Sequence, residues 1–298
     1  MKPLKLALYL GCTIQSEQYA YEMSVRETLP RLGVELVEME GASCCGYPIK
    51  NVSIPMWLYL STRNLAIASQ LGLDILTLCN GCYMSLREAR KALDEDVNLR
   101  SRIAQLLEVE GLKYEGDVKV YHLLDALHDL VGVDRVKDAV ERPLEGLRFA
   151  THYGCHVLRP SELGAPDDPE DPHKLEELIE ALGAETVDYP EKLDCCGAEL
   201  AISYSDASLT MAGLKLKAVQ RRNVDGLVVI CPYCMKMLDA KQDAAKTTLG
   251  DPTIEVPVIY YTQLLGLTMG IDADKLGLNL NLSPIDKLLG KIGGEGVE

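Results

Sequence analysis

The sequence predicts an α/β fold of two pseudo-symmetric domains, each of βαβ type with a mostly parallel sheet, that arose by internal duplication. Three observations lead to this prediction: the cysteines repeat in the same order, apolar runs precede them in both copies, and amphipathic segments separate these runs. Each copy contains a single cysteine, an adjacent pair and a C-x-x-C motif. A glycine, Gly46 or Gly197, follows each pair, and we expect it to relax the turn there.

The apolar runs that precede the cysteines are predicted to be strands, over residues 6–10, 74–78, 147–151 and 227–230. Apolar residues recur at helical spacing over residues 21–32, 55–71, 173–182 and 205–222, which predicts helices between the strands. Such alternation is typical of parallel sheets, whose functional sites gather where loops leave the carboxyl ends of the strands. We therefore expect each copy to collect its cysteines at one sheet edge.

We expect the first domain to span residues 1–144 and the second, which includes a C-terminal tail, residues 145–298. Turn residues over 141–146 separate a helix-like run from the first strand of the second copy. The second copy has 39 residues between its single cysteine and its pair, against 31 in the first. The Pro- and Asp-rich residues 164–172 account for this difference as an inserted surface loop.

The tail, from about residue 271, carries leucines at every second position. Leu276, Leu278, Leu280 and Leu282 alternate with glycine and asparagine, which is the pattern of a strand with one apolar face. We expect this part to dock on a domain of the same chain rather than on a partner. We expect residues 293–296, which are rich in glycine, to be frayed.

Net charge and apolar content exclude several classes of function. A formal charge of −15 and a pI near 4.8 repel phosphate backbones and anionic headgroups, so we expect no binding to nucleic acid or to a membrane surface. No apolar stretch reaches the roughly 20 residues that cross a bilayer. The apolar run before Cys12 mimics a lipoprotein signal but is shorter than the usual ~7–15 residues. We therefore expect a cytoplasmic protein, in which 10 cysteines indicate metal binding rather than disulfides.

The cysteine pattern alone leaves several kinds of site open. The C-P-Y-C motif at residues 231–234 is similar to a thioredoxin-type active site, but the matching C-N-G-C motif at residues 79–82 and the further cysteines disfavour a redox dithiol. Four thiolates would make a structural zinc site, and five cysteines per copy exceed that need; adjacent cysteines also reach two metals of one cluster more easily than one small ion. An ordinary four-iron cubane also takes four thiolates. Either one cysteine per copy is free, or the cluster is not an ordinary cubane.

The duplicated pattern C-x(31–39)-C-C-G-x(32–33)-C-x-x-C resembles the cysteine-rich CCG domain family over nearly the whole chain. Within it, residues 44–51 and 153–160 resemble the catalytic B subunits of archaeal heterodisulfide reductases. The resemblance implies that each copy binds a noncubane 4Fe-4S cluster through all five of its cysteines and that the two clusters face one substrate cavity. The implied ligands are a first set of Cys12, Cys44, Cys45, Cys79 and Cys82, and a second set of Cys155, Cys195, Cys196, Cys231 and Cys234.

The resemblance also implies the reaction and the partners. The reaction is the reduction of a small-molecule disulfide, formed by coenzyme M and coenzyme B, to two thiols. Electrons are expected from a partner subunit with ordinary 4Fe-4S clusters, and a flavin-containing subunit is expected in the larger complex. The duplication suits this chemistry independently, because cleaving a disulfide takes two electrons and an iron–sulfur cluster usually moves one.

Residues next to the cysteines are candidates for catalysis and substrate binding. His156 directly follows Cys155 and is a candidate proton donor to a leaving thiolate, or else a histidine that only hydrogen-bonds a cluster sulfur or a carbonyl. We expect a structural role for His152. Lys50 and Arg159 follow ligands closely and are candidates for binding the sulfonate, carboxylate and phosphate groups of the substrate. A surface salt bridge is the alternative for both.

Two other functions remain open at this point. One is a related B-type subunit of a thiol:fumarate reductase, a succinate:quinone reductase or a sulfur-oxidising heterodisulfide-reductase-like system. The other is a non-catalytic zinc or iron–sulfur scaffold, which metal and sulfide analysis would separate from an enzyme. The sequence contains no G-x-G-x-x-G motif for a flavin or a nicotinamide, so we expect a separate electron-delivering partner.

Overall fold

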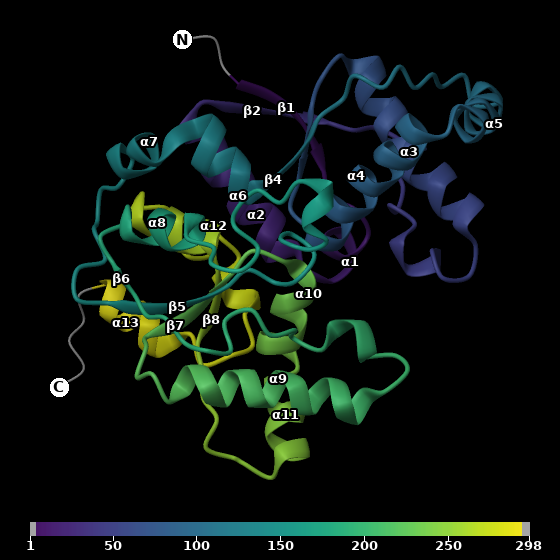
Figure 1. Ribbon diagram of the computed structural model, residues 1–298. Helices are drawn as coiled ribbons and strands as arrows, with labels where there is room; N and C mark the ends of the chain where they lie inside the picture. Colours follow the sequence, from purple (N-terminus) through teal and green to yellow (C-terminus); the bar gives the residue numbers. More distant parts are fainter. Residues whose placement is uncertain (1–3, 294–298) are drawn as a thin grey trace.

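The computed structural model describes residues 4–293 and contains two four-stranded sheets in which all paired strands are parallel (Figure 1). The first sheet has the order β2-β1-β3-β4 and consists of β1 (Leu4–Tyr9), β2 (Val34–Glu38), β3 (Ile75–Thr77) and β4 (Val120–His122). The second has the order β6-β5-β7-β8 and consists of β5 (Arg148–His152), β6 (Glu185–Thr186), β7 (Gly226–Val229) and β8 (Val258–Tyr260). Because the two orders are the same, the predicted α/β class, parallel sheets and duplication are confirmed.

The predicted strands correspond to β1, β3, β5 and β7, which lie at the centre of the two sheets. Helices cover both faces of such sheets, so central strands are continuously apolar and stand out in the sequence. The four edge strands were not predicted. Three of them, β4, β6 and β8, have only two or three residues, too few to show a period, and two glutamates interrupt the apolar residues of β2.

Helical segments connect the strands in both halves. In the first half they are α1 (Thr13–Glu17), α2 (Tyr19–Thr28), η1 (Leu29–Leu32), η2 (Tyr47–Ile49), α3 (Ile54–Leu71), α4 (Asn80–Glu95), α5 (Val97–Glu108), α6 (Leu123–Asp125), η3 (Ala126–Gly132) and α7 (Val133–Asp138). In the second half they are η4 (Ser161–Leu163), α8 (Lys174–Glu180), η5 (Ala198–Leu200), α9 (Ser205–Gln220), α10 (Pro232–Met235), η6 (Lys236–Ala240), α11 (Gln242–Leu249), α12 (Tyr261–Thr268), η7 (Leu278–Leu280) and α13 (Asp286–Gly293). The predicted helices correspond to α2 with η1, α3, α8 and α9. Within residues 4–293, no helix is long and apolar enough to cross a membrane.

Each half packs its last helices on the other half. The segment α6, η3 and α7 follows β4 and lies against α8 of the second half, while α12 follows β8 and lies against α2 of the first (Figure 1). Tyr21 of α2 stacks on Tyr260, with ring centroids 3.9 Å apart, and its hydroxyl donates to the Ile230 carbonyl at 2.9 Å. Ser24 and Thr262 share a hydrogen bond of 2.7 Å. The buried apolar cluster is consequently continuous between the halves.

The predicted boundary between residues 144 and 145 falls between α7 and β5, and no described strand crosses it. The Leu144 amide donates to the Leu182 carbonyl at 2.9 Å, so the connecting segment is attached to the second half. The division into residues 1–144 and 145–298 stays a prediction, since helices on both sides of it share one core. The insertion at 164–172 contains neither helix nor strand, as predicted for a loop.

The prediction of a strand in the tail is wrong. Gly277 has a φ of +68°, in the left-handed region, and starts the short 3₁₀-helix η7, so the leucines do not alternate between two faces. Leu276 and Leu278 are buried, whereas Leu280 and Leu282 are exposed. The predicted docking within the chain is confirmed, because the tail's buried leucines join the core of the molecule.

Polar contacts also attach the tail to the second half. The Asn281 side-chain amide donates to the Val258 carbonyl at 2.9 Å. The Asp239 carboxylate accepts from the backbone N–H of Ser283 at 2.7 Å. Of the residues predicted to be frayed, Gly293 ends α13 and the others lie outside the described residues. Residues 1–3, which belong to the segment that mimics a lipoprotein signal, also lie outside them.

The hydrogen bond between Tyr21 and Ile230 provides a test of how the halves are joined. Tyr21→Phe is expected to lower the free energy of unfolding by about 1–2 kcal/mol, because the buried Ile230 carbonyl loses its donor. Chemical denaturation measures this difference. Tyr19→Phe is the control, since Tyr19 is 50% exposed and its substitution should leave stability unchanged. Equal stability of Tyr21→Phe and the wild type would contradict a structural role for this bond.

Candidate metal centre

All ten cysteines lie beyond the carboxyl ends of strands, which confirms the predicted arrangement at the sheet edges. The single cysteines follow β1 and β5, and the adjacent pairs follow β2 and β6. The C-x-x-C motifs begin α4 and α10: Cys79 and Cys231 are the N-cap residues, with extended backbone, and Cys82 and Cys234 lie in the first helical turn. Both sulfurs of each motif therefore lie at the carboxyl edge of their sheet, where the strand ends and the helix begins.

The two members of each adjacent pair contact different partners. Cys44 Sγ lies 3.8 Å from Cys12 Sγ, whereas the Cys45 thiol, whose pKa is lowered by Cys44 and by Cys82, has Cys82 as its further neighbour. In the second half, Cys195 pairs with Cys155 and Cys196 with Cys234 in the same way. Each pair thus spreads its sulfurs toward two neighbours, as a site with more than one metal requires.

The first and second sets of cysteines meet where the two sheet edges face each other. The thiols of Cys79 and Cys231 lie next to each other across this contact: Cys231 raises the pKa of Cys79. Beside them, the Asn80 side chain donates to the Tyr153 carbonyl at 2.7 Å. The sequence predicted one thiol cluster at each of two edges, and the structure brings the two clusters together.

Gly46 and Gly197 form the turns behind the paired cysteines, as predicted. Their φ angles are +79° and +89°, which a residue with a Cβ adopts only with strain. These turns direct the glycine amides at sulfur: the Gly46 N–H donates to Cys44 Sγ at 3.4 Å and the Gly197 N–H to Cys195 Sγ at 3.3 Å. Backbone donors of this kind stabilise a thiolate, the form that binds metal.

The thiols differ in burial and acidity. Cys12 is exposed, three others are partly buried, and the remaining six are buried. The hydrogen bond from the Cys44 thiol lowers the pKa of Cys45, and the one from Cys155 lowers the pKa of Cys195. Each half therefore contains a thiol whose neighbours favour its ionised form.

This donor set suits an iron–sulfur cluster better than a single zinc ion. Thiolates are soft ligands, and a structural zinc ion uses four ligands around one point. Here each half offers five thiols, and the adjacent pair in each half reaches toward two different partners. The residues therefore fit a group with several metal atoms.

A cavity of about 560 Å³ lies between the halves and is lined by all five cysteines of the second set. The first half contributes Tyr47, Lys50, Asn80 and Glu88 to its wall, and the second contributes His156. Four cysteines of the first set line a much smaller space of about 20 Å³. Tyr47 borders both spaces, so the two sets lie on either side of one region.

The structure places two of the three predicted non-cysteine residues at this cavity. His156 Nδ1 lies 3.3 Å from Cys155 Sγ, and its Nε2 is 3.0 Å from the Tyr47 hydroxyl. Lys50 lines the cavity but also forms a 2.5 Å ion pair with Glu88. Arg159 is exposed, donates to the Pro169 carbonyl at 3.1 Å and does not line the cavity. The roles assigned to these three residues stay predictions.

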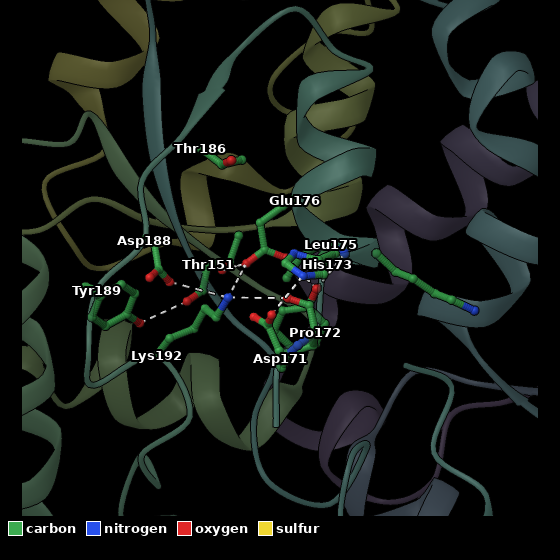
Figure 2. Close-up of polar contacts among 12 residues, drawn as sticks. Thr151, Asp171, Pro172, His173, Leu175, Glu176, Thr186, Asp188, Tyr189 and Lys192 are labelled. Atoms are coloured by element: carbon green, nitrogen blue, oxygen red, sulfur yellow. Dashed lines mark hydrogen bonds and ion pairs between the residues drawn. The ribbon is translucent and has the colours of Figure 1, made fainter. Parts of the chain in front are cut away.

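An ion network around a buried lysine supports the loop that precedes Cys195. Lys192 is only 8% exposed, and its ammonium contacts the partly buried Glu176 at 3.2 Å and the exposed Asp188 at 3.4 Å; Thr151 donates to Glu176 at 2.6 Å (Figure 2). The Lys192 carbonyl accepts from His152 Nδ1 at 3.4 Å. Sequence reasoning did not find this network, because its residues come from separate segments.

The fold and the site together define a class: a duplicated α/β protein that gathers two cysteine sets at facing sheet edges. The family model of the cysteine-rich domain, CCG, matches residues 6–87 and 149–239, and the chain belongs to this family. The family resemblance seen in the sequence is thereby confirmed.

Known relatives support a redox role. The chain is 35% identical over 292 residues to the B subunit of the ferredoxin:CoB-CoM heterodisulfide reductase of Methanosarcina mazei, covering 97% of both chains. It is 32% identical to the 8-methylmenaquinol:fumarate reductase membrane anchor subunit of Wolinella succinogenes, over 95% of this chain and 99% of that one. Both relatives are named as subunits of reductases, which supports an oxidoreductase role and, with the thiol sets, iron–sulfur binding.

A solved structure supports the fold alone. A hypothetical protein from Helicobacter pylori superimposes with a TM-score of 0.76 at 16% identity. The match covers 94% of this chain and 52% of that one, so this chain spans about half of that protein.

The turn at Gly197 provides a test of how the pairs are held. A Cβ at this position would lie 2.5 Å from the Ser208 carbonyl oxygen, whereas one at Gly41, which also has positive φ, would meet nothing within 4 Å. Gly197→Ala is expected to cost at least ~1 kcal/mol more than the control Gly41→Ala. Denaturation midpoints measure the difference, and equal losses would show that the close approach does not matter.

Proposed function

We propose that this chain is the catalytic subunit of a reductase complex that reduces the mixed disulfide of coenzyme M and coenzyme B to two thiols. In this proposal the first and second sets each hold one noncubane 4Fe-4S cluster through all five cysteines. The observation that carries the proposal is that two five-cysteine sets lie next to each other, and that the second set lines a cavity to which the first half contributes Tyr47 and Lys50. The similarity to heterodisulfide reductase B subunits supports the same substrate.

The reaction consumes two electrons and two protons for each disulfide cleaved. When bound, each cluster would supply one electron. The chain's own residues position the substrate and deliver a proton. His156 is suited to give a proton to a leaving thiolate, because its imidazole lies on the cavity wall and its Nε2 is fixed by the Tyr47 hydroxyl at 3.0 Å.

Substrate binding requires cations in a strongly acidic protein. The substrate carries sulfonate, carboxylate and phosphate groups, and Lys50 is the predicted cation that lies on the cavity wall. Its ion pair with Glu88 holds the ammonium in place and also reduces its net attraction for an anion. Arg159 directly precedes Pro160, which lines the cavity. In this proposal the Arg159 side chain turns toward the cavity when the substrate binds.

Electrons come from outside the chain in this proposal. An electron-delivering 4Fe-4S subunit and a flavin-containing subunit would complete the assembly, in a reducing compartment such as the cytoplasm. The names of the relatives, which describe subunits of multi-subunit reductases, support such an assembly.

The Wolinella relative supports a second candidate, a subunit of a fumarate reductase that uses the same two cysteine sets. A non-catalytic scaffold is the third. Disulfide turnover by the chain separates the first candidate from both others.

Metal analysis tests the two cysteine sets. The anaerobically purified chain is expected to contain about eight irons with matching sulfide, as two four-iron clusters require. Cys45→Ser and Cys196→Ser are each expected to lose about half of the iron, because each removes a ligand from one set. Each variant is the control for the other half. Zinc without sulfide in the wild type, or loss of all iron in either variant, would contradict the assignment.

Turnover tests the reaction and the role of His156. With an artificial one-electron donor, the wild type is expected to reduce the coenzyme M–coenzyme B disulfide, and NADH alone should not drive the reaction. His156→Asn is expected to lower kcat by about 10²–10⁴-fold with iron content unchanged. His173→Asn is the control, since the His173 side chain is 62% exposed. An unchanged kcat in His156→Asn would leave this histidine without a role in proton transfer.

A further inference from the structure

We propose that His152 belongs to the second metal centre and that its imidazole nitrogen contacts the metal group there. Among the residues that the structure describes, the first centre has no equivalent nitrogen at the matching position. This inference rests on the proposed function, because it requires that the cysteine sets hold metal. It changes the role of His152 from the structural one that the sequence indicated to that of a residue in contact with the cofactor.

The position of the imidazole carries the proposal. A ring nitrogen of His152 and the Sγ atoms of Cys196 and Cys234 all lie within 4.8 Å of one another, and all three residues are buried. These distances are those of three groups around a common metal site. His152 therefore extends the second set from five possible ligand atoms to six.

Hydrogen bonding decides which nitrogen faces the sulfurs. His152 Nδ1 lies 3.4 Å from the Lys192 carbonyl, and a carbonyl can only accept, so Nδ1 carries the proton of the neutral ring. Nε2 is then left with a lone pair, and within residues 4–293 it has no hydrogen-bond partner although it is fully buried. A metal beside Cys196 and Cys234 would satisfy this lone pair. Ligating histidines typically donate their other ring N–H to a carbonyl or carboxylate in this way.

The Lys192 carbonyl that orients the His152 ring is itself held in place. The Lys192 carbonyl that holds Nδ1 also accepts from the Lys215 ammonium at 3.3 Å. The Lys192 side chain is anchored by Glu176 and Asp188, in the network of Figure 2. Turning the ring would break the hydrogen bond of Nδ1 to this anchored carbonyl, so the observed orientation, with Nε2 on the side of the sulfurs, is favoured.

The first half differs at the matching position. Tyr9-Leu10-Gly11-Cys12 aligns with His152-Tyr153-Gly154-Cys155, so Tyr9 takes the place of His152 at the end of its strand. The Tyr9 hydroxyl donates to the Ser43 carbonyl at 2.7 Å and offers no nitrogen. The two centres thus have different surroundings although their cysteine sets are equivalent. We expect two separate reduction potentials, since ligand type and neighbouring groups set the potential of iron–sulfur clusters.

Labelled histidine provides the test. The wild type is prepared with ¹⁵N-histidine, and each centre is examined by pulsed EPR in a paramagnetic oxidation state. One centre is expected to show a histidine-nitrogen coupling that His152→Tyr abolishes, with iron and sulfide unchanged. His156→Asn is measured beside it, because His156 Nδ1 lies 3.3 Å from Cys155 Sγ and gives a coupling of its own. His128→Asn is the matched control, since His128 pairs with Asp129 and Glu177 away from the cysteines.

A second pair of variants keeps the test decisive if the tyrosine disturbs the loop. His152→Gln should also abolish the coupling, and in either His152 variant the potential of only one centre should shift. Tyr9→His, the converse change, should add a nitrogen coupling to the first centre. Unchanged coupling and potentials in both His152 variants would overturn this inference and leave the proposed function intact. A wild-type chain without iron would overturn both.

Discussion

The loops that follow parallel strands all leave at the carboxyl edge of the sheet, and in this protein two such edges face each other. Cys79 and Cys231 each begin a helix directly after a strand, and their neighbouring thiols mark where the two cysteine sets meet. The packing of α12 on α2, and of α6 to α7 on α8, holds the edges together. The separation of the two sets therefore depends on contacts that neither half makes alone.

Burial of so many thiols places strong demands on their surroundings. A buried polar group costs free energy unless it has a partner, and ionised sulfur costs more. The protein offers mutual thiol hydrogen bonds, the amides of Gly46 and Gly197, and, near the second set, the ammonium of Lys215. Burial lowers the pKa of Lys215 to about 8, so below that pH a positive charge lies beside the thiolates. These groups can offset negative charge on the sulfurs, as binding of a metal by thiolates requires.

The sequence was sufficient for the parts of the fold that repeat. The order of the cysteines predicted the duplication, and the apolar runs before them predicted the central strands and the edge at which each set gathers, because each of these rests on local pattern. The contact between Cys79 and Cys231, the pairing of Tyr47 with His156 and the Lys192 network could not be predicted, because they join segments far apart in the chain. The prediction of a strand in the tail was wrong for a different reason. Gly277 turns the chain where a strand would continue, and the alternation of leucines does not show this turn.

The equivalence of the two cysteine sets contrasts with differences in the residues and spaces beside them. Cys155 is followed by His156 and Cys12 by Thr13. The five thiols of the second set border a cavity of about 560 Å³, whereas four thiols of the first set border a space of about 20 Å³. A symmetric disulfide would need two similar walls. Under the proposed function the substrate has two unlike ends, and a cavity with unlike walls can bind it in one orientation only. In the same proposal one five-cysteine set lies on each side of the S–S bond, while the surrounding residues decide which sulfur faces which centre.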